Sequence, residues 1–350
     1  MRVAIVGATG NVGTAVVRAL QDDDRVGEIV AVARRRPATE AGKVRWVTAD
    51  VTRDALAPAL DGADVVVHLA WLIQPDRHPR IMEAANVDGS RRVFEAAVQA
   101  EAGALVVASS VGAYSPGPKD RAVDESWPTD GIATSIYSQH KARVERLLDA
   151  LEAEHPRLRV VRLRPGLIFQ RDAASEIRRF FLGPLVPTPL LRRGLIPVVP
   201  RTDRLAFQAV HADDVADAYR RAIMDPGARG AFNVAADPVL DADALAATLG
   251  ARAVPVPARV LRAAASLTWH AHLQPTSPGW IDLARGVPTM DITRARTELG
   301  WTPRRSAGDA LLELLDGLGR GAGGATPPLD RHAGGRFRGR ELRTGVGSRP

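Results

Sequence analysis

The chain has 350 residues, of which 45% are hydrophobic and 25% are charged, as in an ordinary globular protein of one large or two smaller domains. It contains no cysteine, which excludes disulfide bonds and thiolate chemistry and fits a cytoplasmic location. Three prolines break the longest apolar stretch, 180–191, which falls short of the roughly 20 residues that a membrane-spanning helix needs. The N-terminus lacks the apolar region of a signal peptide, so we expect a mature cytoplasmic protein without a membrane partner.

The net charge of +7 is concentrated near the C-terminus. Residues 320–350 hold seven Arg and two acidic residues, so the rest of the chain carries a net charge of only +2. Residues 1–319 therefore lack the basic face of a nucleic-acid-binding domain, and we expect no nucleic-acid partner. The segment 319–350 is rich in Gly, Pro and Arg without apolar periodicity, which predicts a disordered tail. A chain that ends at Arg320 is therefore expected to melt and turn over like the full chain.

Short apolar runs alternate with helical patterns through the first half of the chain. The predicted strands are 2–6, 29–32, 44–47, 64–70, 104–108 and 158–163. Helical patterns follow the glycine-rich turn after the first strand and also cover 78–99 and 137–153. This alternation predicts an α/β fold with a doubly wound parallel sheet, the Rossmann arrangement. In such sheets, ligands bind at the carboxyl edge of the strands.

A glycine-rich turn follows the first predicted strand. Gly7, Gly10 and Gly13 are spaced by three residues, and a helical pattern begins directly after them. A strand, a glycine-rich turn and a helix in this order place backbone N–H groups and the positive end of the helix where a pyrophosphate can bind. We interpret this stretch as a dinucleotide-binding turn.

The end of the second strand bears on which dinucleotide binds. Dinucleotide folds usually carry an acidic residue there, which bonds the adenosine ribose. Here the position is Ala33, and Arg34, Arg35 and Arg36 follow it. The loss of a carboxylate and the gain of guanidinium groups favour a 2′-phosphate and hence NADP, with NAD and a merely solvated basic turn as alternatives. Asp50, after the third strand, could hold the adenine amino group.

Tyr137 and Lys141 lie four residues apart at the start of a predicted helix, so they share one face of it. A nearby cation favours the phenolate, but lowering a phenol pKa from about 10 to about 7 takes roughly 4 kcal/mol. Lys141 would therefore need a second positive charge, which an oxidised nicotinamide would supply. The alternative is an ordinary amphipathic helix with a half-buried Tyr. The chain has three Lys against 44 Arg, which favours a specific role for this Lys.

Several further segments complete a pattern that covers residues 1–318. They are Asp50-Val51-Thr52, His68-Leu69-Ala70, Asn86-x-x-Gly89, Ser109-Ser110 with Tyr114, Arg164-Pro165-Gly166, 210–215, 291–295 and 299–303. Together with the glycine turn and Tyr137-x-x-x-Lys141, they resemble the extended short-chain dehydrogenase/reductases of the NAD-dependent epimerase/dehydratase family. The resemblance implies a nucleotide-binding domain over 1–165, a smaller substrate region over 166–318 with elements that return to the sheet, and a homodimer.

The resemblance also implies roles for individual residues. Tyr137 would be the catalytic acid/base, Lys141 would hold the nicotinamide ribose and lower the Tyr pKa, and Ser110 would steady the reacting oxygen. The expected cofactor-binding residues are Gly7, Thr9, Gly10, Asn11, Val12, Gly13, Arg34, Arg35, Asp50, Val51, Leu69, Ala70, Asn86, Tyr137, Lys141 and Pro165. No metal is expected, because His270 and His272 lack a third ligand nearby.

Three functions remain open at this stage. They are an NAD(P)-dependent oxidoreductase for an alcohol or ketone, a nucleotide-sugar epimerase or dehydratase, and a non-catalytic NADP-sensing regulator. The complete set of Ser110, Tyr137 and Lys141 argues against the regulator. Sugar-handling relatives usually have an Asn and an Arg where this chain has Arg164 and Phe207, so we expect a less charged alcohol or ketone.

Overall fold

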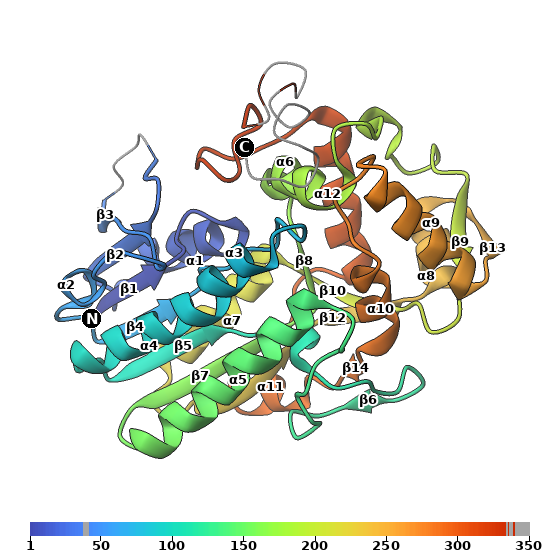
Figure 1. The fold of residues 1–350 in the computed structure, drawn as a ribbon. Coiled ribbons are helices and arrows are strands. Elements are labelled where there is room, and N and C mark those ends of the chain that lie inside the picture. Colours follow the sequence, from blue (N-terminus) through green and yellow to red (C-terminus); the bar gives the residue numbers. More distant parts are fainter. Residues whose placement is uncertain (38–41, 334, 336–338, 340–350) are drawn as a thin grey trace.

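The computed structural model describes residues 1–37, 42–333, 335 and 339. Seven strands form the large sheet in the order β11-β7-β5-β4-β1-β2-β3, and every neighbouring pair is parallel. The predicted α/β fold with a doubly wound parallel sheet is therefore confirmed (Figure 1). The strands are β1 (Arg2–Val6), β2 (Glu28–Ala33), β3 (Val44–Thr48), β4 (Val65–His68), β5 (Ala104–Ala108), β7 (Arg159–Pro165) and β11 (Gly230–Val234).

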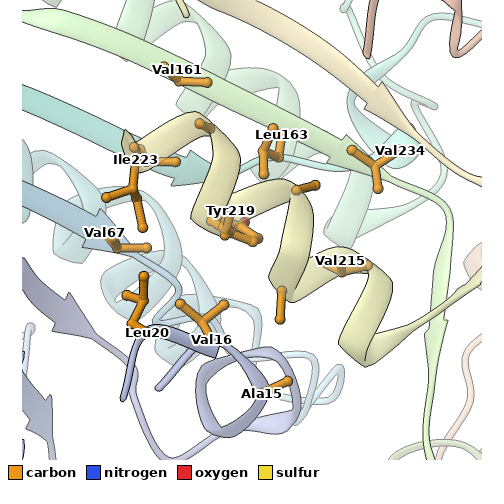
Figure 2. Packing of buried hydrophobic residues seen from close by; sticks show 14 of the residues in the cluster. Ala15, Val16, Leu20, Val67, Val161, Leu163, Val215, Tyr219, Ile223 and Val234 are labelled. Carbon is orange, nitrogen blue, oxygen red and sulfur yellow. The ribbon is translucent and has the colours of Figure 1, made fainter. Parts of the chain in front are cut away.

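Helices cover both faces of this sheet. Side chains alternate along each strand, so Val3 and Ile5 of β1 enter one apolar core while Ala4 and Val6 enter the other. The first core contains α1 (Asn11–Gln21) and α7 (Ala212–Met224), and the second contains α2 (Ala57–Leu60), α4 (Gly89–Gln99) and α5 (Ile136–Glu154). Figure 2 shows the first core, where the side chains of α7 pack among those of α1 and the strands; it labels Ala15, Val16, Leu20, Val67, Val161, Leu163, Val215, Tyr219, Ile223 and Val234.

Two elements differ from their predicted form. The fourth strand ends at His68 rather than residue 70, because the chain leaves the sheet where Ala70 crosses closely over Gly7. The predicted helix 78–99 is built from α3 (Pro79–Glu83), a π-helical turn (Ala84–Asp88) and α4. Such single π turns occur often at functional sites.

Beyond β7 the chain alternates between the large sheet and a smaller region. A three-stranded sheet there contains β8 (Leu167–Phe169), β10 (Phe207–His211) and β12 (Ala236–Leu240), and two short pairs join β9 (Val198–Arg201) to β13 (Arg252–Pro255) and β6 (Ala122–Val123) to β14 (Thr289–Met290). The helices of this part are α6 (Ala174–Ile177), α8 (Ala242–Leu249), α9 (Ala258–His270), α10 (Gly279–Gly286), α11 (Thr293–Thr297) and α12 (Ala307–Arg320).

The predicted boundary of a disordered tail at residue 319 is wrong. The helix α12 continues to Arg320, and residues 321–333 pack against the body of the protein. Leu329 is 1% exposed, and the Thr326 hydroxyl donates a 2.7 Å hydrogen bond to the Thr9 carbonyl. Composition alone missed these anchors, because one buried Leu and a few backbone contacts leave no periodic pattern. The prediction for residues 334, 336–338 and 340–350 lies outside the described residues.

Candidate active site

The glycine turn between β1 and α1 leaves no room for a side chain at Gly7 or Gly13. Gly7 has a φ of +95°, and a Cβ atom there would lie 2.5 Å from the backbone nitrogen of Ala70. A Cβ atom at Gly13 would lie 2.3 Å from the Gly7 carbonyl oxygen. Gly10 caps the N-terminus of α1 without a side chain of its own. The turn therefore presents bare backbone and the positive end of a helix, an arrangement that suits a phosphate.

A cleft of about 1020 Å³ opens at this turn. Nine of the expected cofactor residues line it: Gly7, Thr9, Gly10, Arg34, Arg35, Asp50, Val51, Leu69 and Ala70. Arg36, the third Arg of the basic turn, lines it as well; other lining residues were not predicted, among them Trp71, Gln74, Glu176, Arg179 and part of the segment 325–333. The volume and the glycine turn together fit the adenosine and diphosphate parts of a dinucleotide.

The end of β2 supplies positive charge to this cleft. Ala33 is buried, whereas Arg34, Arg35 and Arg36 are exposed. Neither Arg35 nor Arg36 forms an ion pair with another residue of the described part of the chain. Burial acts to raise the pKa of Asp50, but hydrogen bonds from Thr52 and the charge of Arg34 outweigh it and lower that pKa. The ionised carboxylate thus lines the same cleft as Arg35 and Arg36, whose guanidinium groups remain free to bind an anion.

The structure brings Ser110, Tyr137 and Lys141 together beyond the end of β5. Tyr137 lies in the first turn of α5, whose N-cap, Ser135, accepts a hydrogen bond from a backbone N–H of that turn. The Tyr137 ring packs so closely on Gly112 that a Cβ atom there would lie 2.7 Å from it. Ser110 Oγ and the Tyr137 ring approach the same side of Gly112, and Lys141 Nζ lies 5.9 Å from the centre of the Tyr137 ring. A proton donor, a hydroxyl partner and a cation therefore share one small volume.

The protonation of this group differs from the expected one. Burial raises the pKa of Tyr137 to about 12, against the opposing effect of the Ser110 hydrogen bond. Burial also lowers the pKa of Lys141 to about 7, and Lys141 donates to the Ala108 carbonyl at 2.7 Å. The expected lowering of the Tyr137 pKa by Lys141 is thus not present here. At neutral pH Tyr137 is a neutral phenol, which can donate a proton.

Aromatic rings enclose Tyr137. Lys141 Nζ lies 3.5 Å from the centre of the Trp71 ring, and Trp71 meets Tyr137 edge-on with 5.9 Å between ring centres. Trp280 lies 5.0 Å from Tyr137 and 4.9 Å from Phe181. Trp71 is one of the residues that line the cleft at the glycine turn. The three predicted catalytic residues, Ser110, Tyr137 and Lys141, do not line it. The indole of Trp71 therefore separates the cleft from Ser110, Tyr137 and Lys141.

Buried polar contacts hold these rings in place. The Asp76 carboxylate accepts hydrogen bonds from Ser277 Oγ at 2.6 Å and from Trp280 Nε1 at 3.0 Å. The Asn86 side chain bonds both the N–H and the carbonyl of Leu72, at 2.7 and 2.8 Å, which fixes the segment that carries Trp71. The only sequence signal for Trp71 is its place directly after the predicted strand end.

The other expected cofactor residues support the cleft without lining it. The Asn11 side chain bonds the Ile168 carbonyl and Gln170, Val12 packs on the core, and Pro165 pairs with Val234 in the sheet. Arg164, one of the two positions that bear on sugar binding, is 5% exposed and forms an ion pair with Glu145. Arg164 is therefore not available to a substrate.

An acidic residue also faces the glycine turn. Glu176 of α6 lines the cleft together with Thr9 and Gly10, near enough to the backbone N–H of Asn11 for that group to act on its pKa. Burial raises the pKa of Glu176 to about 7, although the charge of Arg179 and the Asn11 hydrogen bond oppose the shift. A carboxyl group thus lies at the helix end where a phosphate would bind.

The model of the family described as "NAD dependent epimerase/dehydratase family" matches residues 3–235. The chain belongs to this family. The family is described as NAD dependent, and the parallel sheet reported above has the Rossmann arrangement. None of the described helices is long and apolar enough to cross a membrane, and no cluster of three potential metal ligands occurs among the described residues.

The chain is also similar to several individual proteins. The uncharacterized protein Rv2047c of Mycobacterium tuberculosis is 29% identical over 314 residues; the match covers 89% of this chain but 29% of the relative, so the chain spans less than a third of that relative's length. A ceramide reductase of Caulobacter vibrioides is 31% identical over 216 residues, 61% of this chain and 58% of the relative. The structure of DesIV, a dTDP-glucose 4,6-dehydratase from Streptomyces venezuelae with NAD and TYD bound, has a TM-score of 0.67 at 22% identity and covers 91% of this chain and 96% of DesIV. At that identity the likeness establishes the fold alone.

Proposed function

We propose that this protein is an NADP(H)-dependent oxidoreductase that interconverts an apolar ketone and the corresponding alcohol. The observation that carries the proposal is the aromatic surroundings of Tyr137: Trp71 and Trp280 contact its ring, and Phe181 packs in turn on Trp280. Such surroundings favour an apolar substrate portion next to the proton donor. The ceramide reductase relative supports the same direction, because its name describes reduction of a lipid.

The nucleotide-sugar alternative has less support at the residue level. A nucleotide diphosphate is best held by free guanidinium groups, which bind it in a bidentate, charge-assisted way. Arg164 is already paired with Glu145, and Phe207 packs on the apolar core of the three-stranded sheet. Neither residue is arranged to hold a diphosphate.

In the proposed reaction, bound NADPH would supply a hydride to the carbonyl carbon. The Tyr137 phenol would donate its proton to the carbonyl oxygen, and Ser110 would hydrogen-bond that oxygen as its charge develops. Lys141 would hold the reacting end of the cofactor and compensate the charge on Tyr137 after proton transfer. The adenosine part fits the existing cleft, whereas access to Tyr137 requires the Trp71 side chain to move from the Lys141 ammonium.

The deciding experiment combines binding with turnover. The purified protein is saturated with NADPH or NADH, and apolar ketones, sugars and nucleotide sugars are screened for a decrease in nicotinamide absorbance. Stoichiometric oxidation of NADPH by an apolar ketone is the expected result. Conversion of a nucleotide sugar to an epimerised or dehydrated product without net cofactor turnover would instead establish the alternative.

Cofactor choice gives a separate prediction. We expect NADPH to bind more tightly than NADH, because Ala33 leaves the ribose without an acidic partner and Arg35 is free of ion pairs among the described residues. A charge-assisted hydrogen bond contributes about 1.5–3 kcal/mol, so Arg35→Ala should weaken NADPH binding by about 10- to 100-fold. NADH binding should stay unchanged in the same titration calorimetry. Arg53→Ala, which removes another exposed Arg of the cleft, is the control, and equal or tighter binding of NADH by the wild type contradicts the proposal.

Glu176 predicts a pH dependence of cofactor binding. Its pKa of about 7 in the folded protein means that the side chain is neutral at pH 6 and ionised at pH 8.5, where it repels a phosphate. Glu176→Gln should therefore tighten NADPH binding about tenfold at pH 8.5, or about 1.4 kcal/mol, and change it little at pH 6. Protonation of the NADPH phosphate does not affect the comparison, because the dissociation constants of variant and wild type are compared at the same pH. An unchanged ratio of the two dissociation constants from pH 6 to pH 8.5 would contradict this role.

A further inference from the structure

The chain does not leave the body of the protein at the end of α12. Gly321 takes a φ of +63° and turns the backbone, and residues 322–333 then run back beside α6 (Figure 1). We name this segment the strap. It lies more than 300 residues after the glycine turn in the sequence and yet contacts it directly, through Thr326 and Thr9.

Each anchor of the strap joins it to an element around the cleft. Thr326 donates to the Thr9 carbonyl at 2.7 Å, Ser175 donates to the Asp330 carbonyl at 3.1 Å, and Arg179 donates to the Pro328 carbonyl at 2.8 Å. Leu329 is fully enclosed, and its carbonyl accepts from Gly324 N–H at 2.9 Å. The strap is thus fastened to the glycine turn and to the helical segment that begins at α6.

The strap also forms one wall of the cleft. It contributes Ala325, Pro327, Pro328, Asp330, His332 and Ala333 to the same lining as Gly7, Thr9, Gly10 and the three Arg after β2. The two prolines restrict the backbone of this wall, so ordering it costs less conformational entropy than an ordinary loop would. A dinucleotide on the glycine turn would therefore be held between the sheet edge and the strap.

We propose that the strap is part of the cofactor site, that it closes over the dinucleotide and that it must lift before the dinucleotide leaves. The inference rests on the proposed function, since it requires NADPH to bind in this cleft. Its fastening is modest: among the described residues it consists of one buried Leu, the three hydrogen bonds with Thr9, Ser175 and Arg179, and the bond from Ala322 N–H to the Gly317 carbonyl of α12. Segments held by so few contacts open locally without global unfolding. Opening of the strap thus sets the release rate of the cofactor.

The test compares cofactor release from three chains: the full chain, one that ends at Ala333 and keeps the strap, and one that ends at Gly321 and lacks it. Stopped-flow fluorescence follows bound NADPH as excess NADP⁺ displaces it. We expect the release rate of the chain ending at Gly321 to rise at least about tenfold, and that of the chain ending at Ala333 to equal the full chain. In the full chain, Leu329→Ala combined with Thr326→Val should raise the rate in the same direction, which keeps the test valid if the short chain does not fold.

The outcomes separate the two proposals. If the full chain binds NADPH and all variants release it at the same rate, the strap proposal is wrong and the proposed function stands. If the full chain binds neither NADPH nor NADH, both are wrong. If release accelerates only in the chain without the strap and in the double variant, while circular dichroism shows intact folding, the strap belongs to the cofactor site.

Discussion

Tyr137→Phe should lower the turnover of a ketone substrate by about 10²- to 10⁴-fold, which is the usual contribution of a positioned proton donor. The substitution removes only the hydroxyl, so the ring keeps its contacts with Gly112, Trp71 and Trp280. NADPH binding should therefore stay near normal. Steady-state kinetics with the ketone identified in the screen, together with NADPH titration, measure both quantities.

Tyr219→Phe provides the matched control for this experiment. Tyr219 lies on α7 and is 1% exposed in the core that contains α1, and its hydroxyl has no hydrogen-bond partner in the described part of the chain. Removal of this hydroxyl should leave turnover unchanged and stability equal or slightly higher, because it removes an unpaired buried polar group. A Tyr137→Phe enzyme with nearly full activity would rule out Tyr137 as the proton donor.

The large sheet could be predicted because its strands carry local signals. Six apolar runs, alternating with helical patterns, gave all its strands except β11. The strand β11 was not predicted, because its position in the sheet depends on pairing with β7 rather than on its own apolar pattern. The paired residues Gly230 and Val161 are 69 residues apart in the sequence. Buried Asn233 in this short strand is explained only by its bonds to Tyr114 Oη and the Asp291 carbonyl.

The candidate site also contains residues that local sequence patterns predict and residues that they do not. The glycine turn and the Tyr137–Lys141 pair are local patterns whose geometry follows from a turn and one helical repeat, so the sequence located them. Trp71, Glu176 and the strap enter the site only through tertiary contacts, and composition predicted disorder for the strap. The pKa of Tyr137 could not be inferred either, because its direction depends on burial and on the position of the Lys141 ammonium.

Arg164 illustrates how one residue type supports two interpretations. In the sequence, Arg164 stands where sugar-handling relatives usually have an Asn, and this difference favoured a less charged alcohol or ketone as substrate. In the structure it belongs to a buried ionic network: Arg164 Nε and Nη2 lie 2.9 and 3.0 Å from the two carboxylate oxygens of Glu145. Arg162 Nη1 approaches the same carboxylate at 2.9 Å, and Ser109 donates to it as well. The partner, 19 residues away on α5, is invisible to a linear pattern.

The second large effect is expected from this network. Glu145 is 1% exposed and compensates two guanidinium groups that are themselves buried. Glu145→Ala would leave both charges without this carboxylate, and breaking a buried pair in this way costs about 3–5 kcal/mol. Urea unfolding should show a loss of that size in the free energy of unfolding. Glu152→Ala, which removes a more exposed partner of Arg162, is the control and should cost much less.

The same network predicts loss of stability in acid. Burial acts to raise the pKa of Glu145, but the hydrogen bond and charge of Arg164 outweigh it and lower that pKa to about 2. Because the folded value lies below the unfolded value of about 4.5, the stabilisation is fully present above about pH 4.5 and is lost as pH falls toward 2. Glu145→Gln keeps the shape of the side chain but cannot titrate, so its unfolding free energy should depend less steeply on pH between 4.5 and 2. Identical pH profiles for wild type and Glu145→Gln would show that Arg164 and Arg162 are compensated by other groups.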